Sequence, residues 1–297
     1  MKPNRLIICL LILLVTAISC TKDDESGPVI KGYLNGAEVK EIKITKGTTF
    51  TFKYEIEASS NLTKVEVFVR RGIGLLTDTQ LFLRKEAVAG DLEGNTYSVE
   101  GTLIATTDVM VSIGAIDSQG NISILQLNAI MDISEFVDLS MGDAKADGTS
   151  KSFCNAQYGL NLFIANARAD LKAIDFGFAY LEADVNAKAC LISFSEYSKV
   201  GTYAITNATN VTTFRKATSY TYAKAADLEA AYSSGTAYAA LSGYTAGMVA
   251  SNIQLNDVIA FKTQAGKYGL ILVTGLDRKT EAATNEQTIK YNLVVQK

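Results

Sequence analysis

The fold is decided by one stretch, Thr49-Phe50-Thr51-Phe52-Lys53-Tyr54-Glu55-Ile56, in which polar and apolar residues alternate strictly. Every second side chain of a β-strand points to the same face, so this pattern predicts a strand with one buried face and one wet face. The aromatic members would fill a core, while the threonines, Lys53 and Glu55 would meet solvent. The stretch therefore predicts a sheet that covers a core on one side only.

Similar short strands are predicted on both sides of this stretch. They are separated by Gly and Asn turns and show almost no helical pattern, which is typical of a β-sandwich. Asn35-Gly36 is a strong signal for a tight turn. Only the part from 70 to 93 is less regular, with a short strand expected at 81–83. The other expected strands are 29–34, 39–45, 50–56, 62–69, 97–103, 109–116 and 122–130.

The last expected hairpin turns at Asp117-Ser118-Gln119-Gly120-Asn121. This hairpin resembles the final two strands of bacterial immunoglobulin-like domains, and the resemblance covers residues from about 29 to 133. It implies an Ig-like β-sandwich over 29–135. The likeness concerns architecture alone, because the Cys…Trp…Cys core of antibody domains is missing.

A second domain is predicted over 136–297, of the α+β class and dominated by sheet, so the whole chain is expected to be mainly β. A boundary is expected near 133–137. The nearly all-apolar stretch 173–181 predicts a central strand, and 223–234 is the best helix pattern, ended by Gly235. A helix of about three turns is expected at 161–172. Further strands are expected at 153–160, 189–194, 255–263, 268–273 and 288–295, with 209–216 either a strand or irregular.

The segments Asp257–Thr263 and Gly266–Ile271 predict a hairpin with a short Gly-containing turn. It is similar to the closing hairpin of a domain found repeatedly in surface lipoproteins of Bacteroidota, and the resemblance covers most of 137–297. That family is largely uncharacterised and has no known catalytic residues. The resemblance therefore implies no catalytic site in this chain.

The N-terminus has the pattern of a secretory signal. A basic start precedes the apolar run Leu6–Ala17, which is shorter than the roughly 20 residues of a membrane-spanning helix. Ala17-Ile18-Ser19 followed by Cys20 resembles a bacterial lipobox. The resemblance implies a signal peptide over 1–19 and acyl chains, such as palmitate, that anchor Cys20 to a membrane. A plain cleaved signal with a chance cysteine is the alternative.

An acidic leader follows Cys20 and is predicted to be a tether over 20–28. Its Lys22-Asp23-Asp24-Glu25 resembles the signal that sends lipoproteins of Bacteroidota to the outer face of the outer membrane. The resemblance implies a lipid-anchored protein that faces outward from the cell surface. A charge-rich, solvated tether is the simpler interpretation, and both can hold at once.

Composition narrows the function further. The chain has no histidine, which excludes Ser-His-Asp and Cys-His catalysis and the usual His-containing zinc sites. Loss of Lys2 and Arg5 with the leader lowers 28 basic residues to 26 against 31 acidic ones, a net charge of −5 that disfavours nucleic acid as a partner. Paired carboxylates, as in glycosidases, are what remains for catalysis. We expect no enzymatic activity and no cofactor.

Cys154 and Cys190 remain after the leader and its cysteines are set aside. In an oxidising compartment such a pair could form a disulfide, which would stabilise a loop of this size by about 3–4 kcal/mol if the geometry allows. The bridge becomes feasible if the two cysteines lie on neighbouring strands. Two separately buried thiols are the alternative.

One polar loop raises the question of a metal. Asp143 and Asp147 could coordinate calcium, but they lack the run of ligands that an EF-hand loop has. We therefore expect a plain loop and no metal.

Tyrosines gather in an Ala-, Ser- and Gly-rich span. Tyr232 lies on the expected buried face of its helix, so we expect it in the core. Sugars stack on the flat faces of tyrosine rings, which makes Tyr220, Tyr222, Tyr238 and Tyr244 candidates for binding a glycan, although the chain has no tryptophan. The sequence thus favours a ligand-capture module for a glycan or a protein. The alternative is a structural or adhesive surface protein that contacts host or neighbouring proteins.

Overall fold

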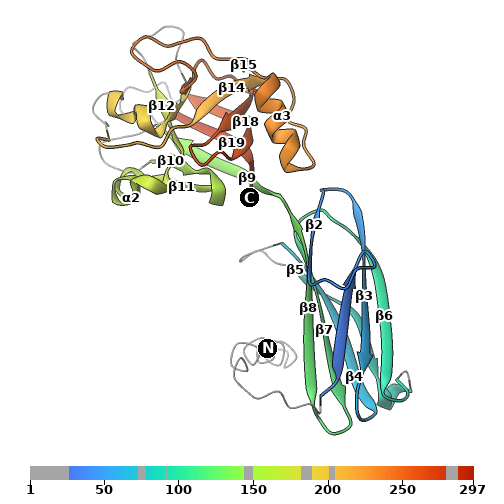
Figure 1. The fold of residues 1–297 in the computed structure, drawn as a ribbon. Helices are drawn as coiled ribbons and strands as arrows, with labels where there is room; N and C mark the ends of the chain where they lie inside the picture. The colour runs from blue at the N-terminus through green and yellow to red at the C-terminus, as the bar shows by residue number, and fades with distance from the viewer. Residues whose placement is uncertain are drawn as a thin grey trace. The chain divides into compact units, whose positions relative to one another are not determined.

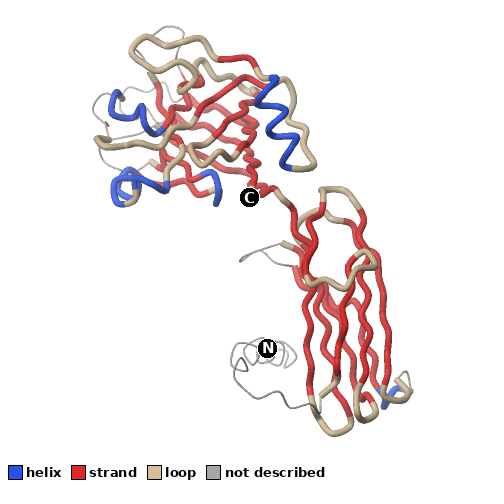
Figure 2. Tube along the Cα trace, in the orientation of Figure 1, coloured by secondary structure: helices blue, strands red, loops and turns tan. Residues whose placement is uncertain are grey.

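The computed structural model describes residues 27–72, 78–90, 92–143, 150–181, 189–200, 205–278 and 287–297. The expected signal peptide, Cys20 and the Lys22-Asp23-Asp24-Glu25 signal lie outside these residues. The described chain is mainly β, as the sequence predicts (Figures 1 and 2). It forms two compact units, the first from residues up to 42 and 49–129, and the second from 43–48 and 130–297.

The first unit is a β-sandwich of two antiparallel sheets. The deciding stretch forms β3 (Thr49–Glu57), with even-numbered residues buried and odd-numbered residues facing solvent. The Tyr54 hydroxyl donates a hydrogen bond of 2.6 Å to the Val111 carbonyl, which ties the two sheets together. One sheet has the order β1-β3-β6, with β1 Val29–Leu34 and β6 Thr96–Ile104. The other has the order β2-β8-β7-β4-β5, with β2 Glu41–Ile44, β4 Leu62–Arg71, β5 Asp78–Glu86, β7 Val109–Asp117 and β8 Ile122–Met131.

The predicted turn at Asn35-Gly36 is confirmed, because φ is 49° at Asn35 and 80° at Gly36. Leu34 and Ala37 exchange two backbone hydrogen bonds across it. The strands that follow and precede the turn do not pair with each other, however. β1 pairs with β3, while β2 lies in the other sheet beside β8.

β5 is longer than the short strand expected at 81–83. It follows β4 as far as Glu86, with a shift of register at Phe82. The Phe82 ring packs edge-on against Phe52, with ring centroids 5.3 Å apart. A residue inserted at this point breaks the period of two, which explains why the alternation is hard to see in the sequence.

The β7–β8 hairpin turns where the sequence predicts. One carboxylate oxygen of Asp117 accepts the backbone N–H groups of Gln119 and Asn121, at 3.0 and 2.9 Å. Burial alone would raise the pKa of Asp117, but hydrogen bonds, chiefly those from the side chain and backbone of Asn121, hold that pKa below its usual value. The turn is therefore held by an ionised carboxylate.

The second unit has two antiparallel sheets with helices outside them. One core cluster takes residues from both sheets, including Phe176, Phe214 and Phe261. A second cluster includes Phe153 and Ile192 and contains Ile164 and Ala167 of α2. α3 packs on β14, β17 and β18. The first sheet has the order β15-β14-β17-β18-β19-β9 and the second β11-β10-β12-β13-β16.

The bounds in this unit are as follows. The first sheet comprises β9 Ile133–Gly142, β14 Thr213–Ala217, β15 Thr236–Ala237, β17 Val258–Lys262, β18 Tyr268–Arg278 and β19 Gln287–Gln296. The second comprises β10 Lys151–Asn155, β11 Leu160–Phe163, β12 Phe176–Tyr180, β13 Ala189–Ser193 and β16 Val249–Ala250. The helices are α2 Ile164–Ala169 and α3 Ala225–Ser234.

Four expectations for this unit need correction. The strand expected at 153–160 breaks after Asn155. The helix expected at 161–172 is confirmed only over α2, because 161–163 belong to β11. The boundary expected near 133–137 lies within β9, which pairs along β19. Gly235 does end α3, but its backbone is not left-handed, with φ −66°. A Cβ there would lie 3.0 Å from the Cβ of Arg215, so close packing is the reason for glycine.

The two glycines at 101 and 114 provide a matched test of the sandwich core. A Cβ at Gly101 would lie 2.6 Å from ring atoms of the fully buried Phe52, whereas one at Gly114 would have no heavy atom within 4 Å. Gly101→Ala should therefore lower the free energy of unfolding by about 1–3 kcal/mol through overpacking. Gly114→Ala should change it by less than about 0.5 kcal/mol. Chemical denaturation of both variants measures the difference, and equal stability would contradict the packing of β3 on β6.

Candidate functional site

The structure does not bring the four candidate tyrosines together. Tyr220 and Tyr222 are neighbours, with ring centroids 5.2 Å apart. Tyr238 packs against the core cluster between the two sheets of the second unit, while Tyr244 packs against the other cluster. All four rings are half-buried. They therefore do not form one stacking platform.

The Tyr220–Tyr222 pair is already engaged with charged groups. Lys46 Nζ lies 5.0 Å from the Tyr222 ring centroid and 2.7 Å from a carboxylate oxygen of Glu135. Burial raises the pKa of both hydroxyls. A cation over the ring of Tyr222 occupies a face that a sugar would need.

Tyr238 and Tyr244 also serve packing. The Tyr238 hydroxyl is buried and has no hydrogen-bond partner within the described part of the chain. Lys199 Nζ lies 5.9 Å from the centroid of the Tyr244 ring. Tyr232 is half-buried rather than in the core, and its hydroxyl lies 2.6 Å from Thr213 Oγ1. Its expected core position is wrong because α3 buries only Leu228 fully.

The candidate disulfide between Cys154 and Cys190 does not form. Cys154 lies on β10 and Cys190 on β13, with β12 between them. Two inter-strand spacings amount to about 10 Å, beyond the roughly 7 Å that a bridge can span between Cα atoms. Both residues are buried, in different core clusters. Burial raises the pKa of the Cys154 thiol to about 12, so that thiol is inert.

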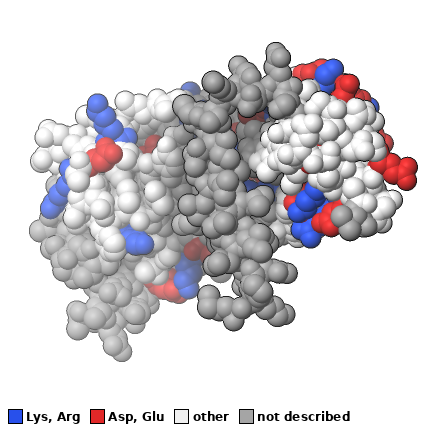
Figure 3. Space-filling model, turned by 90° about the horizontal axis from the view of Figure 1, so that it is seen from below, with Lys and Arg blue, Asp and Glu red and all other residues white. Residues whose placement is uncertain are grey.

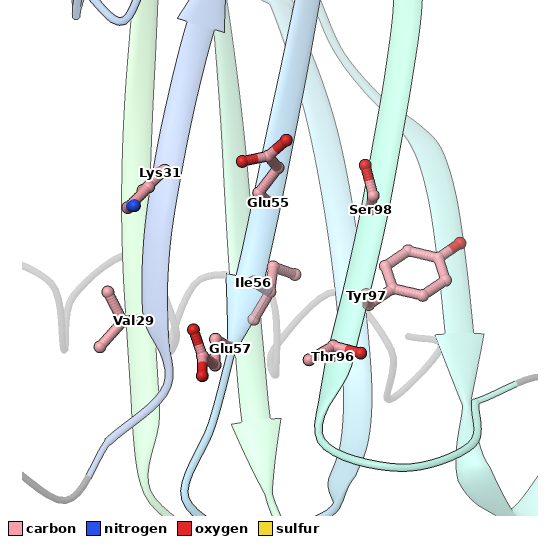
Figure 4. Close-up of a pocket in the computed structure, with 8 residues that line it drawn as sticks. All are labelled: Val29, Lys31, Glu55, Ile56, Glu57, Thr96, Tyr97 and Ser98. Atoms are coloured by element: carbon pink, nitrogen blue, oxygen red, sulfur yellow. The ribbon is translucent and has the colours of Figure 1, made fainter.

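A surface hollow of about 530 Å³ lies on the outer face of the first sandwich (Figure 4). Neighbouring residues on its three strands face each other across the sheet. Lys31 is opposite Glu55, and Glu55 is opposite Ser98; one step along, Val29, Glu57 and Thr96 form the next row. The lining is completed by Ile56 and Tyr97.

The two carboxylates of the hollow have different surroundings. Glu55 accepts hydrogen bonds from Lys53 Nζ, at 2.6 Å, and from the Tyr33 hydroxyl, at 2.9 Å. The hydrogen bond from Lys53, followed by that from Tyr33, lowers the pKa of Glu55. Glu57 is exposed and forms no ion pair with a lysine or arginine among the described residues. The hollow thus offers a carboxylate, an ammonium group at Lys31 and two hydroxyls to a ligand.

Sequence reasoning missed this hollow, although part of its signal was present. Glu55 lies on the wet face of the deciding stretch and Glu57 continues that face in β3, so a polar surface there was predictable. Which residues of β1 and β6 flank them depends on the register between strands far apart in the chain. No local pattern encodes that register.

Metal and membrane sites find no support in the described part of the chain. Its His, Cys, Asp and Glu residues form no group of three or more that could hold a metal ion. Asp143 instead accepts the backbone N–H of Tyr180 at 3.1 Å, and Asp147 lies outside the described residues. None of the described helices is both long and apolar enough to cross a bilayer.

Acidic and basic side chains are interspersed on the face that Figure 3 shows.

Comparison with solved structures gives several likenesses, three of which are described. No family model and no curated protein matches the chain. A DUF4466 family protein from Parabacteroides merdae is similar over 92% of this chain and 99% of that one, with 12% identity and a TM-score of 0.41. A mutant β-glucosidase from Listeria innocua in complex with laminaribiose aligns over 34% of this chain and 16% of that one, at 10% identity and a TM-score of 0.21. A sporulation control protein from Bacillus subtilis aligns over 59% and 82%, at 8% identity and a TM-score of 0.21.

Proposed function

We propose that this chain is a non-catalytic lipoprotein of the outer-membrane surface that captures a ligand, with a glycan as the first candidate. The polar hollow on the outer face of the first sandwich is the observation that carries the capture role. The lipobox at Cys20 and the acidic signal behind it support the proposed location on the outer-membrane surface. In this proposal the first sandwich is Ig-like.

The chemistry of the hollow fits a ligand rich in hydroxyl groups. Glu57 can accept hydrogen bonds from sugar hydroxyls, Lys31 can donate them, and Thr96 and Ser98 can do both. Val29, with 61% of its surface exposed, offers apolar surface for the face of a sugar ring. The hollow therefore combines polar and apolar contacts in the way that a glycan needs.

A catalytic role fits this hollow poorly. A glycosidase needs one carboxylic acid that stays protonated, which requires a raised pKa. The pKa of Glu55 is lowered instead, by Lys53 and Tyr33. Glu55 is thus a poor general acid, and capture without turnover is the better proposal.

An adhesive role is the second candidate, and a different surface favours it. On the outer face of the five-stranded sheet, Ile122 and Ile124 have 64% and 47% of their surface exposed. Ile124 lies opposite Gly114, which has no side chain to cover it. Exposed apolar residues beside a glycine suit contact with another protein.

The capture role is tested on a glycan array with the lipid-free chain from Thr21. For a glycan that binds, the double change Glu57→Ala and Ser98→Ala should raise Kd roughly tenfold or more. Glu41→Ala, which removes an exposed glutamate from β2, is the matched control and should leave Kd unchanged. Binding that depends on Tyr220 and Tyr222 but not on Glu57 and Ser98 would contradict the hollow as the glycan-binding site. Failure to bind any glycan, together with affinity for a protein, would favour the adhesive role.

The proposed location on the outer-membrane surface is tested in cells. Proteinase added to intact cells should degrade the wild-type protein, and replacing Lys22, Asp23 and Asp24 with alanine should protect it. Cys20→Ala should release the protein or leave it uncleaved and unlipidated. Immunoblotting and mass spectrometry of the N-terminus measure both results. A wild-type protein that resists proteinase on intact cells does not face outward.

A further inference from the structure

β6 has an open edge in the first sandwich. It is the last strand in the order β1-β3-β6, and Figure 1 shows it at the margin of its sheet. Its 9 residues pair with β3 without any shift of register, from Ile104 opposite Thr49 to Thr96 opposite Glu57. The edge is therefore long and regular.

The hydrogen-bond phase of the sheet shows which residues of β6 face this edge. The Ala58 N–H donates to the Asn95 carbonyl, at 2.8 Å, and antiparallel ladders alternate from one residue to the next. On the other side of β3, the Asn35 N–H donates to the Thr51 carbonyl, which fixes the same phase independently. The backbone N–H and C=O groups that point outward thus belong to the even-numbered residues Thr96, Ser98, Glu100 and Thr102.

The same residues present their side chains on the outer face, where all of them are exposed. Glu100 lies opposite Lys53, but Lys53 is held by Glu55 at 2.6 Å. With Glu57 one row beyond Glu55, the surface beside the edge is acidic. A strand added along β6 would place alternate side chains next to these carboxylates, where basic residues are favoured.

The other edge strands of the first sandwich are less suited to pairing. β5 carries the register shift at Phe82 together with Arg84 and Lys85, and both a bulge and basic side chains discourage strand addition. β2 has only 4 residues and β1 only 6. β6 has no proline, lysine or arginine and no bulge along its length. It is the edge on which a further strand fits best.

We propose that the β6 edge binds an extended peptide from a partner protein by strand addition, with basic residues at alternate positions. Main-chain hydrogen bonds to the even-numbered residues supply affinity, and Glu100 and Glu57 supply the preference for positive charge. This binding goes beyond glycan capture, because it uses the backbone of β6 rather than the side chains of the hollow. A second copy of this chain is a poorer occupant, because it would bring its own acidic face to the same place.

Ser98→Pro tests the proposal, with Ser98→Ala as its matched control. Proline removes the outward N–H of residue 98, and strand edges tolerate it because that N–H bonds nothing within the sheet. The probe is a short peptide of alternating lysine and threonine, and the protein is the lipid-free chain from Thr21. Calorimetry should show binding that weakens roughly tenfold or more in Ser98→Pro and changes little in Ser98→Ala. Thermal unfolding of both variants confirms that they are folded.

Two changes in the peptide keep the test decisive even if Ser98→Pro does not fold. N-methylation at alternate positions removes main-chain donors and should abolish binding to the wild-type protein. Glutamate in place of lysine should weaken binding strongly. Equal binding of the N-methylated peptide, or of the peptide to a folded Ser98→Pro, overturns strand addition, and equal binding of the glutamate peptide overturns the charge preference.

Further outcomes separate this proposal from pairing with a second copy and from glycan capture. A dimer seen in sedimentation and abolished by Ser98→Pro would assign the edge to a second copy and overturn the peptide proposal. Thr102→Pro removes an outward N–H on β6 at a residue that does not line the hollow; glycan binding that survives in this variant while peptide binding is lost supports the proposal and leaves the proposed function intact. Peptide binding without any glycan binding supports strand addition at β6 and contradicts only the proposed capture of a glycan.

Discussion

The first sandwich depends on the alternation of β3. Phe50, Phe52, Tyr54 and Ile56 are all buried, and burying each such side chain stabilises the fold by about 1.5–3 kcal/mol. A slip of one residue would move all four side chains to the solvent-exposed face, so the register is strongly fixed. Because side chains alternate along a strand, the odd-numbered residues must then face outward. The chemistry of the outer face follows from this packing requirement.

That outward face gives one sheet two separate surfaces. The side chains of β1, β3 and β6 form the hollow, where a carboxylate, an ammonium group and hydroxyls lie within neighbouring rows. The backbone of β6 forms the edge, whose donors and acceptors no other described strand uses. A rigid core beneath both surfaces holds them in place, because Phe52 leaves no room for a side chain at Gly101. Such preorganisation favours the proposed capture of a ligand, because it lowers the entropy lost on binding.

Local patterns explain how much of this the sequence predicts. β3, the β7–β8 hairpin and the β17–β18 hairpin are predictable because alternation and turn residues lie side by side in the chain. β5 is hidden by the insertion at Phe82, and β9 by the polar residues of an edge strand. The tyrosines are close in sequence but belong to different packing layers, and the separation of Cys154 from Cys190 depends on the strand order. The hollow requires the register of three strands, which no single segment contains.

Native-state hydrogen exchange along β6 tests the central claim most directly. The claim is that the packing of β3 sets the phase of the sheet, and hence which groups of β6 are offered to a ligand. The amides of Tyr97, Val99 and Gly101 should exchange slowly, because they bond to β3, while those of Thr96, Ser98, Glu100 and Thr102 should exchange fast. Protection of the even-numbered amides with fast exchange of the odd-numbered ones would contradict the account.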